Sequence, residues 1–419
     1  MIAFLITAIF LYVPVAYAEN PLVLSWQDCL REAKANNPDL VAAREQLNQS
    51  KADRAITKSG GLPNLTSDSG FDRSKSTGKQ RADTHAYGVN ASQLLFDGFK
   101  TSYDVQSAGA GVKAAQYNYD VASSNVRLDL RSAFVDLLNA QEFLGVAQNI
   151  ARRRKHSLDL VALRYQGGAE HRGSLLTAQA NWAQAQLDIE RTQRDIELSR
   201  RRLVKIMGWP QYKPVAARGD LSMAVIDPKQ PLFEDMIAGV PFLRQLTARK
   251  EAAKFGLQSA RADFFPRIYA NAGIGRTDSS WPPGKTSWSA GLSLTFSLFE
   301  GGARQARVSR ARAVLGQAQA EERGGRDGVI LTLAETWTQW QDSAGSVEVQ
   351  KKFARAARER AKIAQAQYAS GLIRFNEWII IENELVNAQK SLLNVETAAL
   401  IAQANWAQAK GETLDALEQ

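Results

Sequence analysis

The sequence has few of the residues that catalytic and metal sites use most. Its 419 residues include one cysteine, Cys29, and three histidines, His85, His156 and His171. A single cysteine cannot form an intrachain disulfide, and no histidine has a metal-ligand spacing with Cys29 or with a carboxylate cluster. Cys29 follows Trp26-Gln27-Asp28 instead of small apolar residues, which argues against lipid attachment and favours a buried helical thiol.

The sequence motifs of common enzymes are also missing. It contains no Gly-x-Ser-x-Gly elbow and no Walker phosphate-binding pattern. The stretch Gly273-Ile274-Gly275 lacks a third glycine and lies in a predicted strand, so it is not a dinucleotide-binding loop. We therefore expect no enzyme activity, no cofactor and no bound metal.

One uninterrupted apolar run is present, from Ile2 to Val13, and it is too short to span a bilayer as a helix. Pro14 ends it, and Ala16-Tyr17-Ala18 places small residues where a signal peptidase reads. This pattern predicts a cleaved export signal over residues 1–18, with a buried N-terminal helix as the alternative. The formal charge of +9 suits nucleic acid, anionic lipid or an acidic partner. Export argues against nucleic acid.

Several of the twelve prolines cluster between residues 210 and 238, which predicts an irregular connector. The connector separates two stretches that share landmarks at a constant offset of 203 residues. The matched pairs include Pro38 and Pro241, Phe96 and Phe299, Gly98 and Gly301, Tyr165 and Tyr368, Gly168 and Gly371, and Gly208 and Gly411. We infer an internal duplication, with repeats over 19–209 and 239–411 and a tail over 412–419.

Each repeat is expected to hold two strands followed by two helices. Alternation of apolar with small polar residues predicts strands at about 64–74 and 86–97 in the first repeat, and at 267–277 and 287–298 in the second. Heptad spacing then predicts helices at about 98–167 and 174–207, and at 301–370 and 374–410. The first of these would be about 105 Å long. Three glycines in the second long helix, Gly324, Gly325 and Gly328, predict a local kink.

The nearly identical stretches "LLFDG" and "SLFEGG" mark the two strand-to-helix junctions. They supply Phe96, Asp97 and Gly98 in the first repeat, and Phe299, Glu300 and Gly301 in the second. We expect the acid to cap the first helical turn and the glycine to allow the tight passage from strand to helix.

Strands of about ten residues with opposite polar and apolar faces have the length of tilted transmembrane β-strands. Half of a soluble sandwich would show the same alternation, but it would not need such long helices. Bilayers exclude open sheet edges, and four strands cannot close a barrel. Three chains would supply twelve strands around a polar lumen, continued by a hollow helical cylinder.

The order and spacing of these features resemble the TolC family of outer-membrane efflux and secretion ducts. The resemblance rests on the export signal, on the opening "SWQDCLREAKANNPDL", on the duplicated strand pair, and on the tips "YQGGAEHRGSLLTAQ" and "YASGLIRFNEWIIIENE". It implies a fold that combines helices with strands: a homotrimer with a twelve-stranded outer-membrane β-barrel continuous with a periplasmic α-helical barrel. The implied partners are outer-membrane lipid, a periplasmic adaptor and an inner-membrane pump of ABC or RND type.

The resemblance also suggests site residues. Tyr165 and Gly168, and Tyr368 and Gly371, correspond to helix tips where adaptors dock. Glu377, Arg374 and Tyr368 correspond to the periplasmic aperture, although Ile380 stands where relatives often have a second acid. Simpler interpretations stay open. The two tyrosines could be seam residues, and Glu377 could be an ordinary first-turn acid. The basic run at 152–155 is read as a solvated helix face, with contact to an adaptor or to anionic inner-membrane lipid as the alternative, and Trp281 and Trp288 as interfacial aromatics or as loop packing.

Two function classes compete with the channel. A periplasmic adaptor or a coiled-coil scaffold would explain the long helices, but neither needs amphipathic strands in both repeats. Drug efflux and type I secretion use the same kind of duct, and the sequence does not choose between them.

Overall fold

The computed structural model describes residues 21–75, 77, 81–221 and 229–415. The expected export signal at 1–18 lies outside the described residues, as do residues 222–228 of the connector and 416–419 of the tail. The described chain forms two compact units. The tip unit is the described part of residues 1–33, 132–222 and 351–397, and the sheet unit is the described part of residues 34–131, 223–350 and 398–419.

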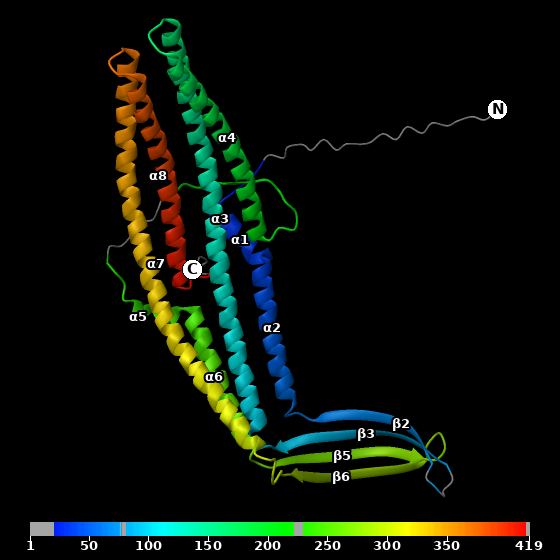
Figure 1. Ribbon diagram of the computed structural model, residues 1–419. Coiled ribbons are helices and arrows are strands. Elements are labelled where there is room, and N and C mark those ends of the chain that lie inside the picture. The colour runs from blue at the N-terminus through cyan, green and yellow to red at the C-terminus, as the bar shows by residue number, and fades with distance from the viewer. Residues whose placement is uncertain (1–20, 76, 78–80, 222–228, 416–419) are drawn as a thin grey trace, which may run out of the picture. The chain divides into compact units, whose positions relative to one another are not determined.

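A four-stranded antiparallel sheet in the order β2-β3-β5-β6 dominates one part of the sheet unit (Figure 1). Its strands are β2 (Asn64–Ser74), β3 (Ala82–Phe96), β5 (Arg267–Asp278) and β6 (Lys285–Thr295). The second strand of the first repeat pairs with the first strand of the second repeat, so the sheet joins both repeats. Strand β3 starts four residues before the expected position, and β6 ends at Thr295 instead of 298.

The sheet contains one irregularity that the alternating pattern does not reveal. The pairing of β3 with β5 shifts register between Leu94 and Phe96, so that Leu94 lies opposite Tyr269 and Phe96 opposite Ile268. A bulge inserts one unpaired residue, here Leu95, and turns the following side chain to the other face. Phe96 therefore shares the face of Ile268, next to the junction with the helix.

Four long helices follow the strands: α3 (Lys100–Gln166), α4 (Arg172–Met207), α7 (Ala303–Ala369) and α8 (Phe375–Ala409). The shorter elements are β1 (Leu22–Leu24), α1 (Trp26–Asn36), α2 (Pro38–Ser59), β4 (Val215–Ala217), α5 (Phe233–Met236), the 3-10 turn η1 (Ile237–Gly239) and α6 (Pro241–Ala262). None of the helices in the described ranges is both long and apolar enough to cross a membrane.

Glycines at repeated positions produce the turns of both repeats. Gly98 and Gly301, Gly168 and Gly371, and Gly208 and Gly411 all have positive φ angles, between 60° and 82°. Residues with a Cβ rarely adopt this conformation. Glycine therefore recurs at an offset of 203 residues because both repeats need a positive φ at the same turns. Space is a second requirement at Gly411, where a Cβ would lie 2.2 Å from the Cδ of Pro241.

Helix α7 is continuous through Gly324, Gly325 and Gly328, so no helix break accompanies the expected kink. Close packing explains one of the three glycines. A Cβ at Gly325 would lie 2.2 Å from the Cδ1 of Leu246 in α6, whereas positions 324 and 328 have nothing within 4 Å. Gly325 therefore makes room for a buried leucine of the neighbouring helix.

Each unit has its own apolar core. In the sheet unit, Trp337, Trp340 and Trp406 pack with Phe233 and Leu333. In the tip unit, Tyr368, Phe375 and Trp378 pack with Val161 and Ala178. Cys29 is fully buried, as expected for a helical thiol, and burial raises its pKa to about 12.

Candidate functional site

The two faces of the sheet differ in chemistry. On one face, polar side chains bond from strand to strand. The Nδ2 of Asn90 donates to the Asp68 carboxylate at 2.6 Å, the Ser92 hydroxyl donates to the Asn271 amide oxygen at 2.9 Å, and the Asn271 amide donates to the Ser293 hydroxyl at 3.0 Å. This face suits contact with water.

The opposite face is apolar and is exposed in a single chain. Its exposed members include Leu65, Val89, Ile274, Trp288, Leu292 and Leu294. Trp288 is 77% exposed, so it is not packed in a loop. Trp281, by contrast, lies edge-on to Tyr87 and His85, with ring centroids 6.3 and 6.0 Å away. Exposed apolar surface of this extent suits lipid contact.

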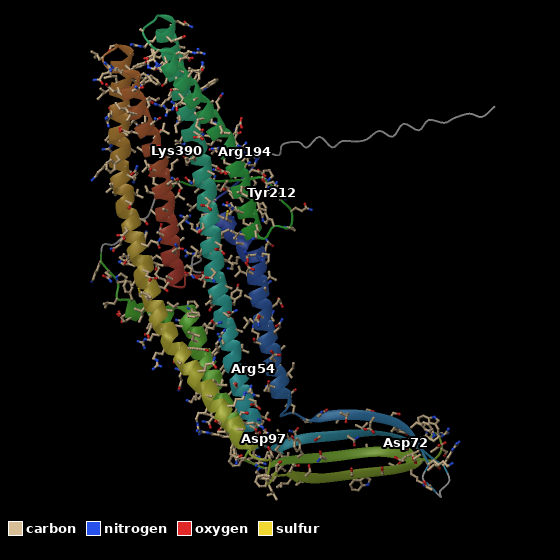
Figure 2. All side chains as sticks on the ribbon, in the orientation of Figure 1. Arg54, Asp72, Asp97, Arg194, Tyr212 and Lys390 are labelled. Atoms are coloured by element: carbon tan, nitrogen blue, oxygen red, sulfur yellow. The ribbon has the colours of Figure 1, made fainter. Side chains whose placement is uncertain are left out.

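The first junction has the geometry expected of a cap. The Asp97 carboxylate accepts hydrogen bonds from the Thr101 backbone N–H at 2.8 Å and from its hydroxyl at 2.5 Å, at the point where β3 meets α3 (Figure 2). A Cβ at Gly98 would lie 2.5 Å from the Cβ of Phe265, so both φ and space require glycine here.

The second junction is built differently. The Glu300 carboxylate accepts hydrogen bonds from Arg304 and Arg307, each at 3.1 Å, instead of capping backbone groups of the first turn. Two successive glycines, Gly301 and Gly302, have positive φ, and Phe299 is exposed. The expected acidic cap is thus present in the first repeat and replaced by ion pairs in the second.

The two helix tips meet in the tip unit through Tyr368. Its hydroxyl donates to the Glu170 carboxylate at 2.9 Å, and its ring stacks on Trp378 with centroids 4.3 Å apart. Arg164 lies over the same ring at 4.9 Å and donates to the Tyr368 carbonyl at 3.1 Å. Burial, aided by the bond to Glu170, raises the pKa of Tyr368 above its usual value.

The two tyrosines predicted at the helix tips have different environments. Tyr368 is completely buried, so it is not available to a docking partner at the surface of one chain. Tyr165 is exposed, although the seam residues before it, such as Val161, are buried. Gly168 and Gly371 lie in the two turns with positive φ.

The predicted aperture residues lie at the start of α8. Arg374 and Glu377 are both exposed, and Glu377 is in the first helical turn. Neither side chain forms an ion pair or hydrogen bond with another described residue. Tyr368, the third predicted member, lies behind them in the core, stacked on Trp378.

The basic run at 152–155 makes two contacts with a neighbouring helix that were not predicted from the sequence, because no spacing signals them. Arg153 donates to the buried Glu382 at 2.6 Å, and Arg154 donates to Asn383 at 2.5 Å. Both contacts join α3 to α8 in the tip unit. The basic run at 152–155 is therefore not one solvated helix face, since two of its four members point toward a neighbouring helix.

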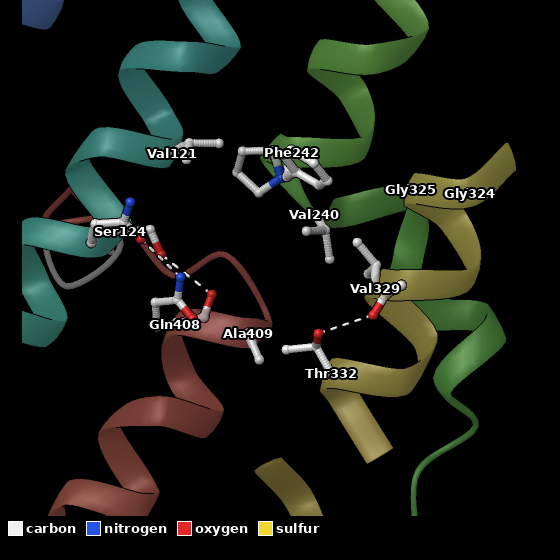
Figure 3. Close-up of a pocket in the computed structure, with 13 residues that line it drawn as sticks. Val121, Ser124, Val240, Phe242, Gly324, Gly325, Val329, Thr332, Gln408 and Ala409 are labelled. Carbon is white, nitrogen blue, oxygen red and sulfur yellow. Dashed lines mark hydrogen bonds between the residues drawn. The ribbon is translucent and has the colours of Figure 1, made fainter. Parts of the chain in front are cut away.

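The sheet unit also contains a pocket of about 500 Å³ between α3, α6, α7 and α8 (Figure 3). Val121, Phe242, Val329 and the three α7 glycines are among its lining residues. None of its lining side chains is titratable, so the pocket offers no acid or base that could activate the hydroxyls of Ser124 and Thr332. Within the described ranges, no group of three or more His, Cys, Asp or Glu side chains is placed to hold a metal ion.

A sequence profile of the family described as "Outer membrane efflux protein" matches residues 29–209 and 232–412. The two matches start 203 residues apart, which confirms the duplication. Outer membrane efflux protein BepC of Brucella suis is 22% identical over 386 residues, covering 89% of this chain and 84% of that protein. Outer membrane protein TolC of Escherichia coli is 22% identical over 415 residues, covering 91% and 81%.

Among solved structures, the fold is similar to the open state of the MtrE outer membrane channel of Neisseria gonorrhoeae. The TM-score is 0.84 at 19% identity, and the match covers 94% of this chain and 90% of that one. The chain therefore belongs to the outer membrane efflux protein family, the TolC family that its sequence resembles, and is a non-enzymatic efflux or secretion channel of the Gram-negative outer membrane.

Proposed function

We propose that three copies of the chain close one conduit through the outer membrane. The observation that carries this proposal is the open sheet, in which β2 and β6 are edge strands. Unpaired backbone groups at such edges have no hydrogen-bonding partner in lipid. Four strands are too few to close a barrel, whereas twelve strands from three chains are enough.

The two faces support the same assignment. The apolar face around Ile274 and Leu292 would contact lipid, and the polar ladder from Asp68 to Ser293 would line the lumen. A lumen lined mainly by small hydroxyl and amide groups has no strong preference for one cargo. The conduit would therefore pass whatever a partner pump delivers, in drug efflux or in type I secretion.

Mass and conductance test this proposal. Purified protein in detergent should scatter light as a particle of three chains, after correction for bound detergent, and should form discrete conducting channels in planar bilayers. A monomer that never conducts would contradict the channel and support the adaptor or scaffold alternative. As a control, protein denatured before reconstitution should give no discrete conductance steps.

We assign the helix tips to the periplasmic end of the conduit. The exposed Tyr165, with the turns at Gly168 and Gly371, would contact a periplasmic adaptor, and an inner-membrane pump of ABC or RND type would supply the energy. Tyr368 would support this surface from behind, because it is buried and bonded to Glu170 of the other tip.

We assign the constriction of the closed conduit to Glu377 and Arg374. Both side chains are exposed at the start of α8, where threefold symmetry would bring three copies together. Because neither is neutralised by another described residue, three Glu377 carboxylates would attract cations to the aperture.

A further inference from the structure

Arg276 lies on the mainly apolar face of the sheet, near its hairpin ends. Arg276 of β5 pairs across the sheet with Tyr87 of β3 and with Thr286 of β6, and Tyr87 pairs in turn with Ser69 of β2. Because residues paired across a sheet share a face, these four side chains form one row, which we call the Arg276 row. It combines a guanidinium with three hydroxyl groups.

The Arg276 row lies at a boundary between two kinds of surface. On one side of it, the neighbouring row is exposed and apolar, with Val89, Ile274 and Trp288. On the other side, toward the hairpin ends, aromatic rings gather: the rings of Phe71 and His85 lie 4.8 Å apart, and Trp281 contacts both His85 and Tyr87. Aromatic residues collect in this way where a membrane-facing surface passes from hydrocarbon to headgroups.

Arg276 also lacks a neutralising neighbour. It is exposed, and it makes no ion pair or hydrogen bond with another described residue. The nearest carboxylate on its own strand, Asp278, accepts hydrogen bonds from the backbone N–H groups of Ser279 and Gly284 instead. By contrast, Arg73 at the end of β2 donates two hydrogen bonds to Asp83, both at 2.7 Å.

We propose that the Arg276 row binds the phosphate of a lipid headgroup in the outer leaflet. The inference rests on the proposed function, which puts this face in lipid and the hairpins at the outer surface. A guanidinium binds phosphate oxygens with two parallel hydrogen bonds. The strands that carry Tyr87 and Thr286 flank the strand of Arg276 at a spacing of about 4.8 Å, so the two side chains are close enough to offer their hydroxyls to the remaining oxygens.

The test uses the intact protein in detergent with two added lipids that have the same acyl chains. One is phosphatidic acid, which carries a phosphate, and the other is diacylglycerol, which does not. Native mass spectrometry counts the lipids that stay bound. The wild type should retain phosphatidic acid in preference to diacylglycerol, and Arg276→Gln should lower that retention at least about tenfold. Arg276→Lys should retain an intermediate amount, since it keeps the charge but not the paired donors.

Arg267→Gln provides the matched control. Arg267 is on the same strand, an odd number of residues from Arg276, so it lies on the opposite face. This variant should retain phosphatidic acid like the wild type. The proposal is overturned if Arg276→Gln keeps wild-type retention, if Arg267→Gln loses as much, or if inorganic phosphate displaces the lipid, which would indicate a site for soluble anions.

Mass and bilayer conductance measured on the same samples separate the two proposals. A conducting trimer whose phosphatidic acid retention is unchanged by Arg276→Gln would disprove only the lipid site. Protein that neither assembles nor conducts would disprove the channel itself.

Discussion

Single residues in the tip unit determine how firmly the two tips are joined. Burial acts against the charge of Glu170, but hydrogen bonds from Tyr368, Ser174 and the His171 backbone outweigh it and hold the pKa of the carboxyl below its usual value. The ionised Glu170 thus adds to the free energy of unfolding, and this contribution is fully present above the pKa of the unfolded state, about 4.3. That contribution is lost as pH falls through the lower pKa of the folded state.

Removing one hydroxyl should test this link. Tyr368→Phe keeps the stack on Trp378 but removes the hydrogen bond to Glu170, so local opening of the tips should become easier by about 1.5–3 kcal/mol at neutral pH. Amide hydrogen exchange of residues 160–175 measures that opening. The difference from wild type should shrink as pH falls through the lowered pKa of Glu170, because the protonated carboxyl bonds Tyr368 more weakly.

Tyr165→Phe is the control for this measurement, because the Tyr165 ring is exposed and its hydroxyl bonds to no other described residue. It should exchange like the wild type at every pH. Equal exchange in Tyr368→Phe and Tyr165→Phe would show that the bond to Glu170 does not hold the tips.

At the scale of elements, the sequence pattern was sufficient where a feature is local and periodic. The alternation and heptad spacing indicated the strand pairs and the four long helices, and the repeated glycines marked turns that require positive φ. Features that depend on distant packing were not readable. The bulge before Phe96 depends on pairing with β5, and the role of Gly325 depends on Leu246 of another helix.

Two glycines of α7 should respond differently to the same substitution. Gly328→Ala adds a methyl group in open space and should stabilise the helix by about 1 kcal/mol through propensity alone. Gly325→Ala gains the same propensity, but its Cβ would force buried Leu246 from its place, so the gain should be lost or reversed. The thermal midpoint followed by helical circular dichroism measures both. Equal shifts in the two variants would contradict the packing argument.

At the scale of the molecule, the duplicated sequence does not form two separate domains. Each compact unit takes segments from both repeats, and the repeats meet at the β3–β5 pairing in the sheet unit and at Tyr368 in the tip unit. A constant spacing between matched residues reveals that the sequence is duplicated, but it does not show which residues of the two repeats contact each other. The same limit applies to Glu170 and Glu382, whose partners come from the other repeat.

The roles proposed for Glu377 and Arg374 depend on contacts between chains. As an ordinary first-turn acid, Glu377 would stabilise α8 by about 0.3–1 kcal/mol through its interaction with the helix dipole, and it would not affect conduction. As part of a ring of three carboxylates, it would select cations and bind divalent ions.

Glu377→Gln separates these roles in single-channel recordings. The ring predicts that cation selectivity falls and that the concentration of a divalent ion needed for half block rises about tenfold, with the trimer intact. Glu359→Gln, which neutralises an exposed acid on α7 of the same unit, should leave both quantities unchanged. If Glu377→Gln conducts and is blocked like the wild type, the aperture does not lie at this residue, and the exposed acid serves only its own helix.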